Sequence, residues 1–335
     1  MRERDILAQL THPNIARLYD AGVSDDGQPF LALEYIDGKP ITEHCDALKL
    51  PIRERLQRFL QVIAAVQFAH ANLVIHRDLK PSNILVSDDA QVHLLDFGIA
   101  KLLDEPQGHT NETELTLIAG RALTLDYASP EQLSGKPIST ASDVYSLGVV
   151  LYQLLTGQKP YPLKRGSRAE LEEAILSTEP TRMSDAVRRG EMSLATTRSL
   201  ARDRLARTLG GDLDTIVNKA TKKEPQQRYL TVAALGEDIQ RYLDGLPVQA
   251  QPDSWGYRAR KFVSRNRIGV AAAAGVTAAL GAALGEMTGY FTGYAGLALV
   301  ENSWVALRIR GWMNRNGLLT IFALSAIPNP FFDLA

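Results

Sequence analysis

The spacing of apolar side chains predicts a few short strands followed by a series of helices. Apolar positions around a polar turn predict strands over 15–20 and 30–35, and a small hairpin is predicted over 84–95. Apolar residues at steps of three and four predict a long helix from Ile52 to Ala71. Further helices are predicted over 3–10, 143–155, 168–176, 213–220 and 232–243. This order is typical of an α+β fold rather than of alternating βα units.

Residues that interrupt the predicted helices and strands occur near both ends of the chain. The first helix ends at His12-Pro13-Asn14, and Gly38-Lys39-Pro40 is expected to act as a hinge-like break. Near the other end, a short proline-containing linker is predicted over 249–253. It is followed by five basic residues with no acid among them: Arg258, Arg260, Lys261, Arg265 and Arg267.

Residues 268–285, which follow the basic residues, carry no charge and consist largely of Ala, Gly, Val and Leu. This length is sufficient for a transmembrane helix, and the basic residues before it would keep the N-terminal side in the cytoplasm. We therefore expect a chain that is anchored in a membrane. The alternative is that these residues form an alanine-rich buried helix.

Composition and charge exclude several classes of protein. The sequence has 335 residues, 45% of them hydrophobic, and a formal net charge of −1, which gives no reason to expect general disorder or nucleic-acid binding. Its single cysteine, Cys45, excludes a disulfide within the chain, as is typical of a reducing compartment. No apolar run follows the charged N-terminal residues, so we expect no signal peptide.

Two polar motifs carry the candidate chemistry, His76-Arg77-Asp78-Leu79-Lys80-Pro81-Ser82-Asn83 and Asp96-Phe97-Gly98. Either Asp-Phe-Gly or His-Arg-Asp alone would be weak, but the pair at this spacing matches the catalytic and metal-binding loops of protein kinases. Phosphoryl transfer needs a carboxylate near the substrate hydroxyl, oxygen ligands for Mg²⁺, and a cation against the transferred phosphate. Asp78 suits the first role, Asn83 and Asp96 suit the second, and Lys80 suits the third.

Over about residues 1–267 the chain resembles the bacterial transmembrane Ser/Thr protein kinases of the eukaryotic-like, or Hanks, type. Ser129-Pro130-Glu131 stands where that family has Ala-Pro-Glu. Asp143 matches the residue that holds the catalytic loop, and Arg228 matches the arginine that pairs with the motif's glutamate. The resemblance implies an enzyme that binds ATP and Mg²⁺ and transfers the γ-phosphate to Ser or Thr of protein substrates.

The resemblance also assigns roles to residues in the loop between Gly98 and Glu131. Thr124 would contact Asp78 and Lys80 near the substrate hydroxyl, and an ordinary loop threonine is the alternative. Arg77 suggests activation by a phosphorylated loop residue, because arginine pairs well with phosphate. The candidates are Thr110, Thr113 and Thr116, unless this threonine-rich stretch is simply a flexible loop.

Nucleotide-binding roles follow from the same resemblance. Leu33 would be the gatekeeper, and Glu34 and Ile36 would belong to the hinge that binds adenine through backbone groups. Without the alignment that the later motifs provide, these residues would be interpreted as a buried strand end. Glu3 would be the helix glutamate that pairs with the ATP-contacting lysine, and it would otherwise be a solvated charge.

That lysine and the family's glycine-rich loop would precede Glu3, and neither is in the sequence. Lys39 and Lys49 come after the first helix and cannot replace the lysine. We therefore expect an N-terminally truncated kinase with little or no activity as it stands, derived from an active parent. The rival interpretation is a pseudokinase that binds partners without catalysis, which the intact Asp78 and Asp96 oppose.

The end of the chain departs from this resemblance. Residues from about 283 to 335 resemble pieces of the DedA/SNARE-associated membrane protein family, through Gly285–Tyr294, Trp312–Gly317 and Ile327-Pro328-Asn329-Pro330. A fusion of two partial families is one interpretation, and a genuine kinase tail with chance glycine-rich similarity is the other. The tail also suggests a rival function as a transporter or lipid-handling membrane protein.

The expected organisation places the kinase portion in the cytoplasm, at the cell inner membrane. A homodimer is expected to allow autophosphorylation. The predicted segments are a small-lobe remnant over 1–36, a large lobe over 37–247, a basic juxtamembrane linker over 248–267, a transmembrane segment over 268–300 and a DedA-like tail over 301–335.

Overall fold

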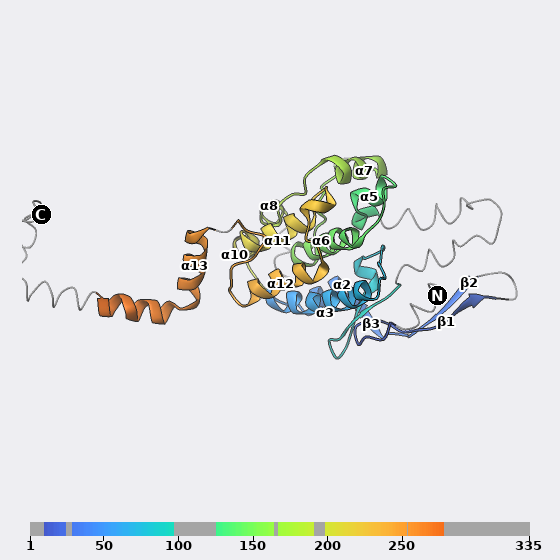
Figure 1. The fold of residues 1–335 in the computed structure, drawn as a ribbon, viewed down its shortest axis with the longest axis horizontal. Helices are drawn as coiled ribbons and strands as arrows, with labels where there is room; N and C mark the ends of the chain where they lie inside the picture. Colours follow the sequence, from blue (N-terminus) through green and yellow to red (C-terminus); the bar gives the residue numbers. More distant parts are fainter. Residues whose placement is uncertain are drawn as a thin grey trace, which may run out of the picture. The chain divides into compact units, whose positions relative to one another are not determined.

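The computed structural model describes residues 10–24, 29–96, 125–163, 167–190, 198–252 and 254–277. The chain divides into two compact units, residues 1–262 and 263–335. In the first unit, the described strands lie within residues 18–94, with two helices over 41–71 between them, and the described regular structure after them is helical (Figure 1). The predicted α+β order is therefore confirmed for this unit.

The first two strands form an antiparallel pair, β1 (Leu18–Val23) with β2 (Pro29–Leu33). Strand β1 begins later than predicted because the residues before it pair elsewhere. Ile15 forms a parallel bridge with Leu94, and the side chain of Asn14 donates a hydrogen bond to the Val92 carbonyl at 2.8 Å. These contacts join the start of the described chain to the second sheet.

The second sheet has the antiparallel order β3-β4-β5, formed by Gly38–Pro40, Ile84–Ser87 and Val92–Leu94. The hairpin of β4 and β5 is the predicted one. The expected break at 38–40 is wrong, because these residues pair with β4. A Cβ on Gly38 would lie 2.8 Å from the Val86 carbonyl oxygen, so glycine at this position permits the close approach of the two strands.

In the described part of the first unit, the other regular elements are helices and short 3₁₀ turns. Two of them, α3 (Ile52–Ala71) and α12 (Val232–Leu243), have the predicted bounds, whereas α6 (Thr140–Thr156) starts before the predicted range. The remaining helices are α2 (Ile41–Ala47), α5 (Pro130–Leu133), α7 (Arg168–Ser177), α8 (Met183–Arg189), α10 (Arg202–Leu209), α11 (Asp212–Ala220) and α13 (Trp255–Arg265), with short 3₁₀ turns at η1 (Pro81–Asn83), η3 (Leu125–Tyr127) and η4 (Pro225–Gln227).

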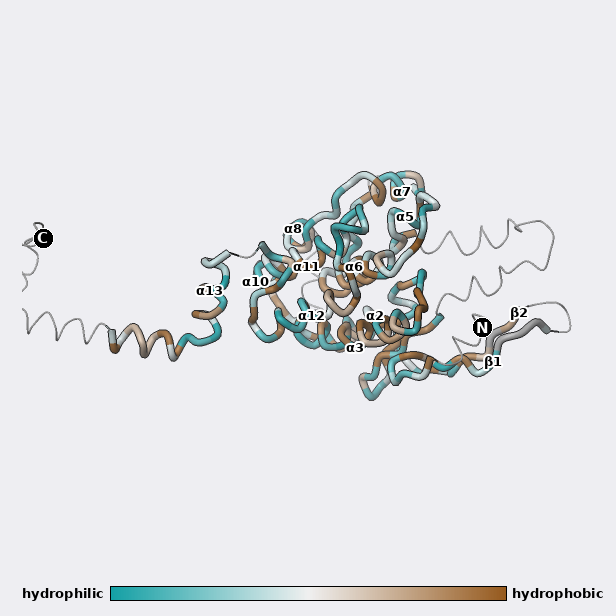
Figure 2. Tube along the Cα trace, viewed as in Figure 1, coloured by the Kyte–Doolittle hydropathy of each residue, from teal (hydrophilic) through white to brown (hydrophobic). Residues whose placement is uncertain are grey.

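Helix α6 forms the centre of the lobe, where it packs against α3, α11 and α12 (Figure 1). Apolar residues follow it along its length (Figure 2), as expected of a helix that is covered on every side. Ser139 caps its N-terminus, and Gly157 ends it with a φ of 76°, a left-handed conformation that glycine adopts without strain. This buried helix carries Asp143 in its first turn.

The segment 248–267, predicted to be a basic linker, is partly folded onto the lobe. Residues Trp255–Arg265 form helix α13. The Tyr257 hydroxyl donates to Asp212 at 3.0 Å and accepts from the Val248 N–H at 2.9 Å, and the Lys261 ammonium lies 2.5 Å from Asp212. Part of the predicted basic linker therefore has regular structure and specific polar contacts with the lobe.

The second unit is described over residues 263–277, of which 263–265 are the end of α13 and 267–277 are also helical. No helix in the described part of the chain is both long enough and apolar enough to cross a membrane. Most of the predicted transmembrane segment, and all of the DedA-like tail, lie outside the described residues. Both remain predictions.

Candidate phosphoryl-transfer site

The buried carboxylate of Asp143 holds the loop that contains His76, Arg77 and Asp78. Its Oδ2 accepts the His76 N–H at 2.8 Å, and its Oδ1 accepts the Arg77 N–H at 2.9 Å. The His70 ring contributes a further contact at 2.7 Å. A carboxylate that is only 1% exposed must be compensated by such partners. Because α6 is buried among neighbouring helices, Asp143 is well placed to hold the backbone of this loop, in which Arg77 has a left-handed φ of 68°.

The buried side chain of His76 connects this loop to the strand that leads into Asp96. Its Nδ1 accepts the Asp78 N–H at 3.3 Å, and its Nε2 donates to the Leu95 carbonyl at 2.8 Å. This pattern requires the neutral tautomer protonated on Nε2. Burial lowers the pKa of His76, and this effect outweighs the opposing influence of Asp143 and the Leu95 carbonyl. The ring is thus a fixed, uncharged bridge between the two motifs.

A second backbone bond strengthens that bridge. The Leu95 N–H donates to the Asn83 carbonyl at 2.8 Å. Both polar backbone groups of Leu95 are therefore bonded to the loop of the first motif. Asp96 follows directly, with an exposed side chain and a φ of 57°, a conformation that aspartate tolerates better than most residues.

Three predicted site residues meet in the loop itself. The Lys80 ammonium lies 2.7 Å from the Asp78 carboxylate. The Asn83 amide donates to the Asp78 carbonyl at 2.9 Å and to its carboxylate at 3.2 Å. The Asp78 side chain is 41% exposed, so the carboxylate is positioned and still open to a substrate. The predicted assembly of Asp78, Lys80 and Asn83 is thus present in the geometry.

Asn83 and Asp96 were predicted to hold Mg²⁺, and their chemistry fits that ion. Asn83 donates through its nitrogen, and its side-chain oxygen makes no hydrogen bond in the described part of the chain. An amide oxygen and an exposed carboxylate are hard oxygen ligands. Among the described residues no group of three or more His, Cys, Asp or Glu side chains could hold a metal by itself. Mg²⁺ usually takes one or two protein ligands and completes its shell with phosphates and water.

Glu131 and Arg228 form the predicted structural ion pair, with distances of 2.7 and 2.8 Å. Arg228 also donates to the carbonyls of Ala141, Lys222 and Lys223. Burial raises the pKa of Glu131, but hydrogen bonds from Arg228 and Ser142 outweigh it, and the pKa is lowered overall. The pair ties α5 to the segment after α11.

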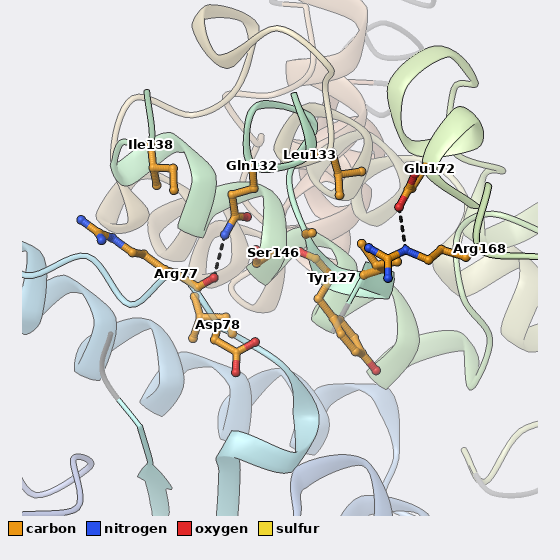
Figure 3. A pocket seen from close by; sticks show the side chains of 12 residues that line it. Arg77, Asp78, Tyr127, Gln132, Leu133, Ile138, Ser146, Arg168 and Glu172 are labelled. Atoms are coloured by element: carbon orange, nitrogen blue, oxygen red, sulfur yellow. Dashed lines mark hydrogen bonds and ion pairs between the residues drawn. The ribbon is translucent and has the colours of Figure 1, made fainter. Parts of the chain in front are cut away.

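Sequence reasoning missed Gln132, which links α5 to the catalytic loop. Its amide donates to the Arg77 carbonyl at 2.7 Å (Figure 3). No local pattern could have revealed this bond, because the two residues lie far apart in the sequence. The hydrogen bond places α5 beside Asp78.

A cavity of about 420 Å³ opens next to Asp78. Figure 3 shows Tyr127, Leu133 and Ile138 around it, together with an ion pair between Arg168 and Glu172 at 2.9 Å. Its walls are Arg77, Asp78, Leu79, Leu125, Tyr127, Ala128, Gln132, Leu133, Ile138, Ser146, Arg168 and Glu172. Such a mixed apolar and polar surface beside an open carboxylate is suited to a peptide rather than to a purely apolar ligand.

The predicted hinge lies at the end of β2. The Glu34 N–H donates to the Arg17 carbonyl at 2.8 Å, and its carboxylate accepts the Arg17 N–H at 3.1 Å. Leu33, Glu34 and Ile36 are partly exposed, and Tyr35 is exposed, so this is not a buried strand end. In the described part of the chain, the backbone groups of Ile36 make no hydrogen bond.

Several predicted site residues lie outside the described residues. They are Glu3, Phe97, Gly98, Thr110, Thr113, Thr116 and Thr124. Their roles stay predictions.

A carboxylate beside an ammonium group, with oxygen ligands one loop away, defines a phosphotransferase-like centre. The family model described as "Protein kinase domain" matches residues 1–238. The chain therefore belongs to the protein kinase family.

Its relatives include bacterial serine/threonine-protein kinases. It is 32% identical over 258 residues to serine/threonine-protein kinase PknB of Mycobacterium leprae (strain TN), covering 74% of this chain and 36% of that protein. It is 33% identical over 262 residues to PknB of Mycobacterium tuberculosis (strain ATCC 25618 / H37Rv), with the same coverage. A probable PknB of Bifidobacterium longum (strain NCC 2705) is 32% identical over 282 residues, covering 79% of this chain and 37% of that protein. The chain thus spans about a third of the length of these relatives.

Proposed function

We propose that this chain is the catalytic part of a protein serine/threonine kinase that transfers the γ-phosphate of ATP to Ser or Thr hydroxyls of proteins. One observation carries the proposal: Asp78, Lys80 and Asn83 converge in one loop, which is bonded to the backbone directly before Asp96. An ordinary surface loop would not be expected to hold these four residues close together through hydrogen bonds and ion pairs.

The chain's own groups divide the work of the reaction. Asp78 accepts or orients the substrate hydroxyl, because its carboxylate is held in place and remains open. Lys80 sets a positive charge beside it, where the phosphoryl group would pass. Asn83 and Asp96 would hold Mg²⁺, which supplies charge neutralisation at the phosphates. The backbone groups of Ile36 are suited to hold the adenine.

Activation by phosphorylation is part of the proposal. In the described part of the chain, the Nε atom of Arg77 is buried without a hydrogen-bond partner. A guanidinium group with an unused, shielded N–H donor is suited to donate to a phosphate oxygen. We expect that partner to be Thr110, Thr113 or Thr116 in its phosphorylated form. A second copy of the chain, in a transient homodimer, would phosphorylate it.

Location at the inner membrane is proposed from the sequence alone. Five basic residues over 258–267 precede the uncharged stretch 268–285, and this order supports a cytoplasmic kinase portion followed by a membrane anchor.

A nucleotide-binding scaffold without catalysis is the second candidate. It is favoured by the sequence itself, which contains no Gly-x-Gly-x-x-Gly, the loop that covers the phosphates in kinases.

Transfer of radiolabelled γ-phosphate to a generic basic protein tests both candidates. The 335-residue chain would be compared with Asp78→Asn and with a version that has a kinase small lobe added upstream. Transfer in the extended version, reduced at least about 100-fold by Asp78→Asn, supports the kinase because general-base contributions are of this size. Nucleotide binding without transfer in either version would instead support the scaffold.

A further inference from the structure

Helices α8 and α10 pack against each other and carry an excess of arginine (Figure 1). Over residues 182–189 and 202–209 the sequence has six arginines and two aspartates, with no lysine or glutamate. All six arginines are exposed, and we call them the arginine patch: Arg182, Arg188, Arg189, Arg202, Arg204 and Arg207. The patch is strongly basic although the whole chain has a formal net charge of −1.

The buried face of each helix determines where the arginines lie. The buried residues of α10 are Leu205, Ala206 and Leu209. The buried residues of α8 are Met183, Ser184, Ala186 and Val187. Because side chains follow the helical period, Arg204 and Arg207 lie on the outer face of α10. For the same reason, Arg188 and Arg189 lie on the outer face of α8.

Little of the positive charge of the arginine patch is neutralised within the protein. Arg188 pairs with Asp185 at 3.2 Å. The Nε atom of Arg207 donates to the backbone carbonyl of Asp203 at 3.3 Å. In the part of the chain that the structure describes, the other four arginines of the patch form no ion pair. The patch therefore presents a net positive charge to the solvent, which attracts anionic partners.

The dimensions and chemistry of the arginine patch select a partner with several phosphate groups. At a rise of 1.5 Å per residue, α10 alone is about 12 Å long, so a single phosphate cannot contact all of its arginines. The planar guanidinium group matches the geometry of phosphate oxygens and binds them with paired hydrogen bonds. An anionic phospholipid surface and a nucleic acid both present arrays of phosphates.

The position of the arginine patch in the lobe favours the phospholipid surface. Asp212 begins α11 shortly after the end of α10, and it contacts Tyr257 and Lys261 of α13. The patch thus lies close to the place where the chain leaves the lobe. From there the sequence continues through further basic residues into the uncharged stretch 268–285, an order typical of segments that approach a membrane.

We propose that the arginine patch of α8 and α10 binds the headgroups of anionic phospholipids and holds the kinase lobe against a membrane surface. The contact is electrostatic, because each basic residue close to an anionic leaflet is attracted by its surface potential. It is also reversible and weakened by salt, since exposed charges are screened over about 10 Å at 0.1 M ionic strength. The contact belongs to the lobe itself and is separate from the predicted membrane anchor and from phosphoryl transfer.

A fluorescent dye at the start of α10 in the full chain tests the proposal locally. Ala201 is exposed and precedes the first residue of α10, so Ala201→Cys provides a thiol for a maleimide dye. The native Cys45 is fully buried, and burial raises its pKa to about 11, so it should react little.

The dye would be observed on two kinds of vesicle that carry a small fraction of lipid with a quencher on its headgroup. One kind consists of phosphatidylcholine, and the other also contains phosphatidylglycerol. We expect quenching only with phosphatidylglycerol. We expect it to be reversed at about 1 M salt, where the Debye length falls to about 3 Å.

Charge variants of the labelled chain test the role of the arginines. Arg189→Gln with Arg204→Gln should lower the equilibrium constant of the contact, measured from the extent of quenching, by about 25-fold, at about five-fold per basic residue. Arg17→Gln with Lys136→Gln is the matched control. It removes the same charge from exposed positions outside the patch and should change the quenching little. Circular dichroism would verify that each variant keeps its fold.

Three results would overturn the proposal. Absence of quenching on phosphatidylglycerol vesicles would show that α10 does not meet the surface, even if the chain sediments with them. Equal quenching on both kinds of vesicle, or equal losses in the two charge variants, would show that the patch does not select anionic lipid. Reversal of the quenching by duplex DNA at a phosphate concentration below that of the lipid would assign the patch to nucleic acid. The assay uses neither ATP nor a protein substrate, so each result is independent of the proposed kinase activity.

Discussion

The carboxylate of Glu131 and the guanidinium of Arg228 form a bidentate ion pair inside the lobe, with side chains that are 4% and 0% exposed. Ser142 donates a third hydrogen bond to Glu131 at 2.7 Å. The pair connects α5, which carries Gln132 to the Arg77 carbonyl, with the segment that follows α11. The position of the substrate-side cavity therefore depends on a contact far from Asp78 in the sequence.

Arg228→Met is expected to lower the free energy of unfolding by about 3–5 kcal/mol, because it leaves the Glu131 charge buried without its partner. Urea denaturation followed by circular dichroism measures this change. Arg168→Met is the matched control. Arg168 pairs with Glu172 at the surface, where its side chain is 53% exposed, so its loss should cost less than about 1 kcal/mol. Similar losses in the two variants would contradict a special role for the buried pair.

Asp143→Asn is expected to loosen the catalytic loop more than the fold. An amide can accept from only one of the two N–H groups that the carboxylate holds, those of His76 and Arg77. Hydrogen exchange should therefore speed up at these two amides, while the free energy of unfolding falls by about 1–3 kcal/mol.

Asp203→Asn, an exposed position on α10, serves as the control for Asp143→Asn and should leave exchange unchanged. If transfer activity is present, Asp143→Asn should reduce it by at least tenfold, as expected when a positioned group is displaced by about 1 Å. Unchanged exchange at His76 and Arg77 would refute the anchoring role of Asp143.

Sequence patterns predicted features that depend on neighbouring residues. The bounds of α3 and α12 followed from apolar spacing, and the loop residues Asp78, Lys80 and Asn83 followed from a contiguous motif. Features that depend on distant partners were missed. The bond from Gln132 to Arg77 joins positions with no common pattern, and helix α13 was obscured by its high content of basic residues.

Gly38 illustrates a local signal that distant packing reverses. Gly-Lys-Pro usually interrupts regular structure, yet Gly38 pairs with Ser87 at the edge of the second sheet. A glycine in a strand can mark close backbone approach rather than a break. The sequence does not show that β4 lies beside Gly38, and only this neighbouring strand distinguishes a close approach of two strands from a break.

Gly38→Ala should lower the free energy of unfolding by about 1–3 kcal/mol, because the new Cβ would overlap a backbone oxygen that cannot easily move. That oxygen belongs to Val86 and would lie 2.8 Å away. Gly256→Ala is the control, since no heavy atom lies within 4 Å of its added Cβ and alanine favours a helix. Thermal unfolding of both variants would decide, and equal stability of Gly38→Ala and the parent would show that β3 can shift.

Lys223 is a partly buried cation that no proposed step of the reaction uses. Its ammonium donates to the Tyr161 hydroxyl and the Ile175 carbonyl, both at 2.7 Å, and to the Ala174 carbonyl at 3.3 Å. Burial lowers its pKa from 10.5 to about 8, although Glu179 acts in the opposite direction. The side chain therefore closes the C-terminal end of α7 at some cost in desolvation.

The lowered pKa predicts how stability depends on pH. Between about 8 and 10.5 the unfolded chain binds more protons at Lys223 than the folded chain does, so the free energy of unfolding gains from this residue as pH rises. Urea denaturation at several pH values up to about 9.5, below the usual range of tyrosine ionisation, would compare the parent with Lys223→Met. The parent should become more stable relative to the variant as pH increases through this window. Lys222→Met, which removes a surface pair with Glu179, controls for the loss of a lysine. The prediction would be contradicted if the free energy of unfolding of the parent, relative to that of Lys223→Met, stayed constant or fell as pH increased.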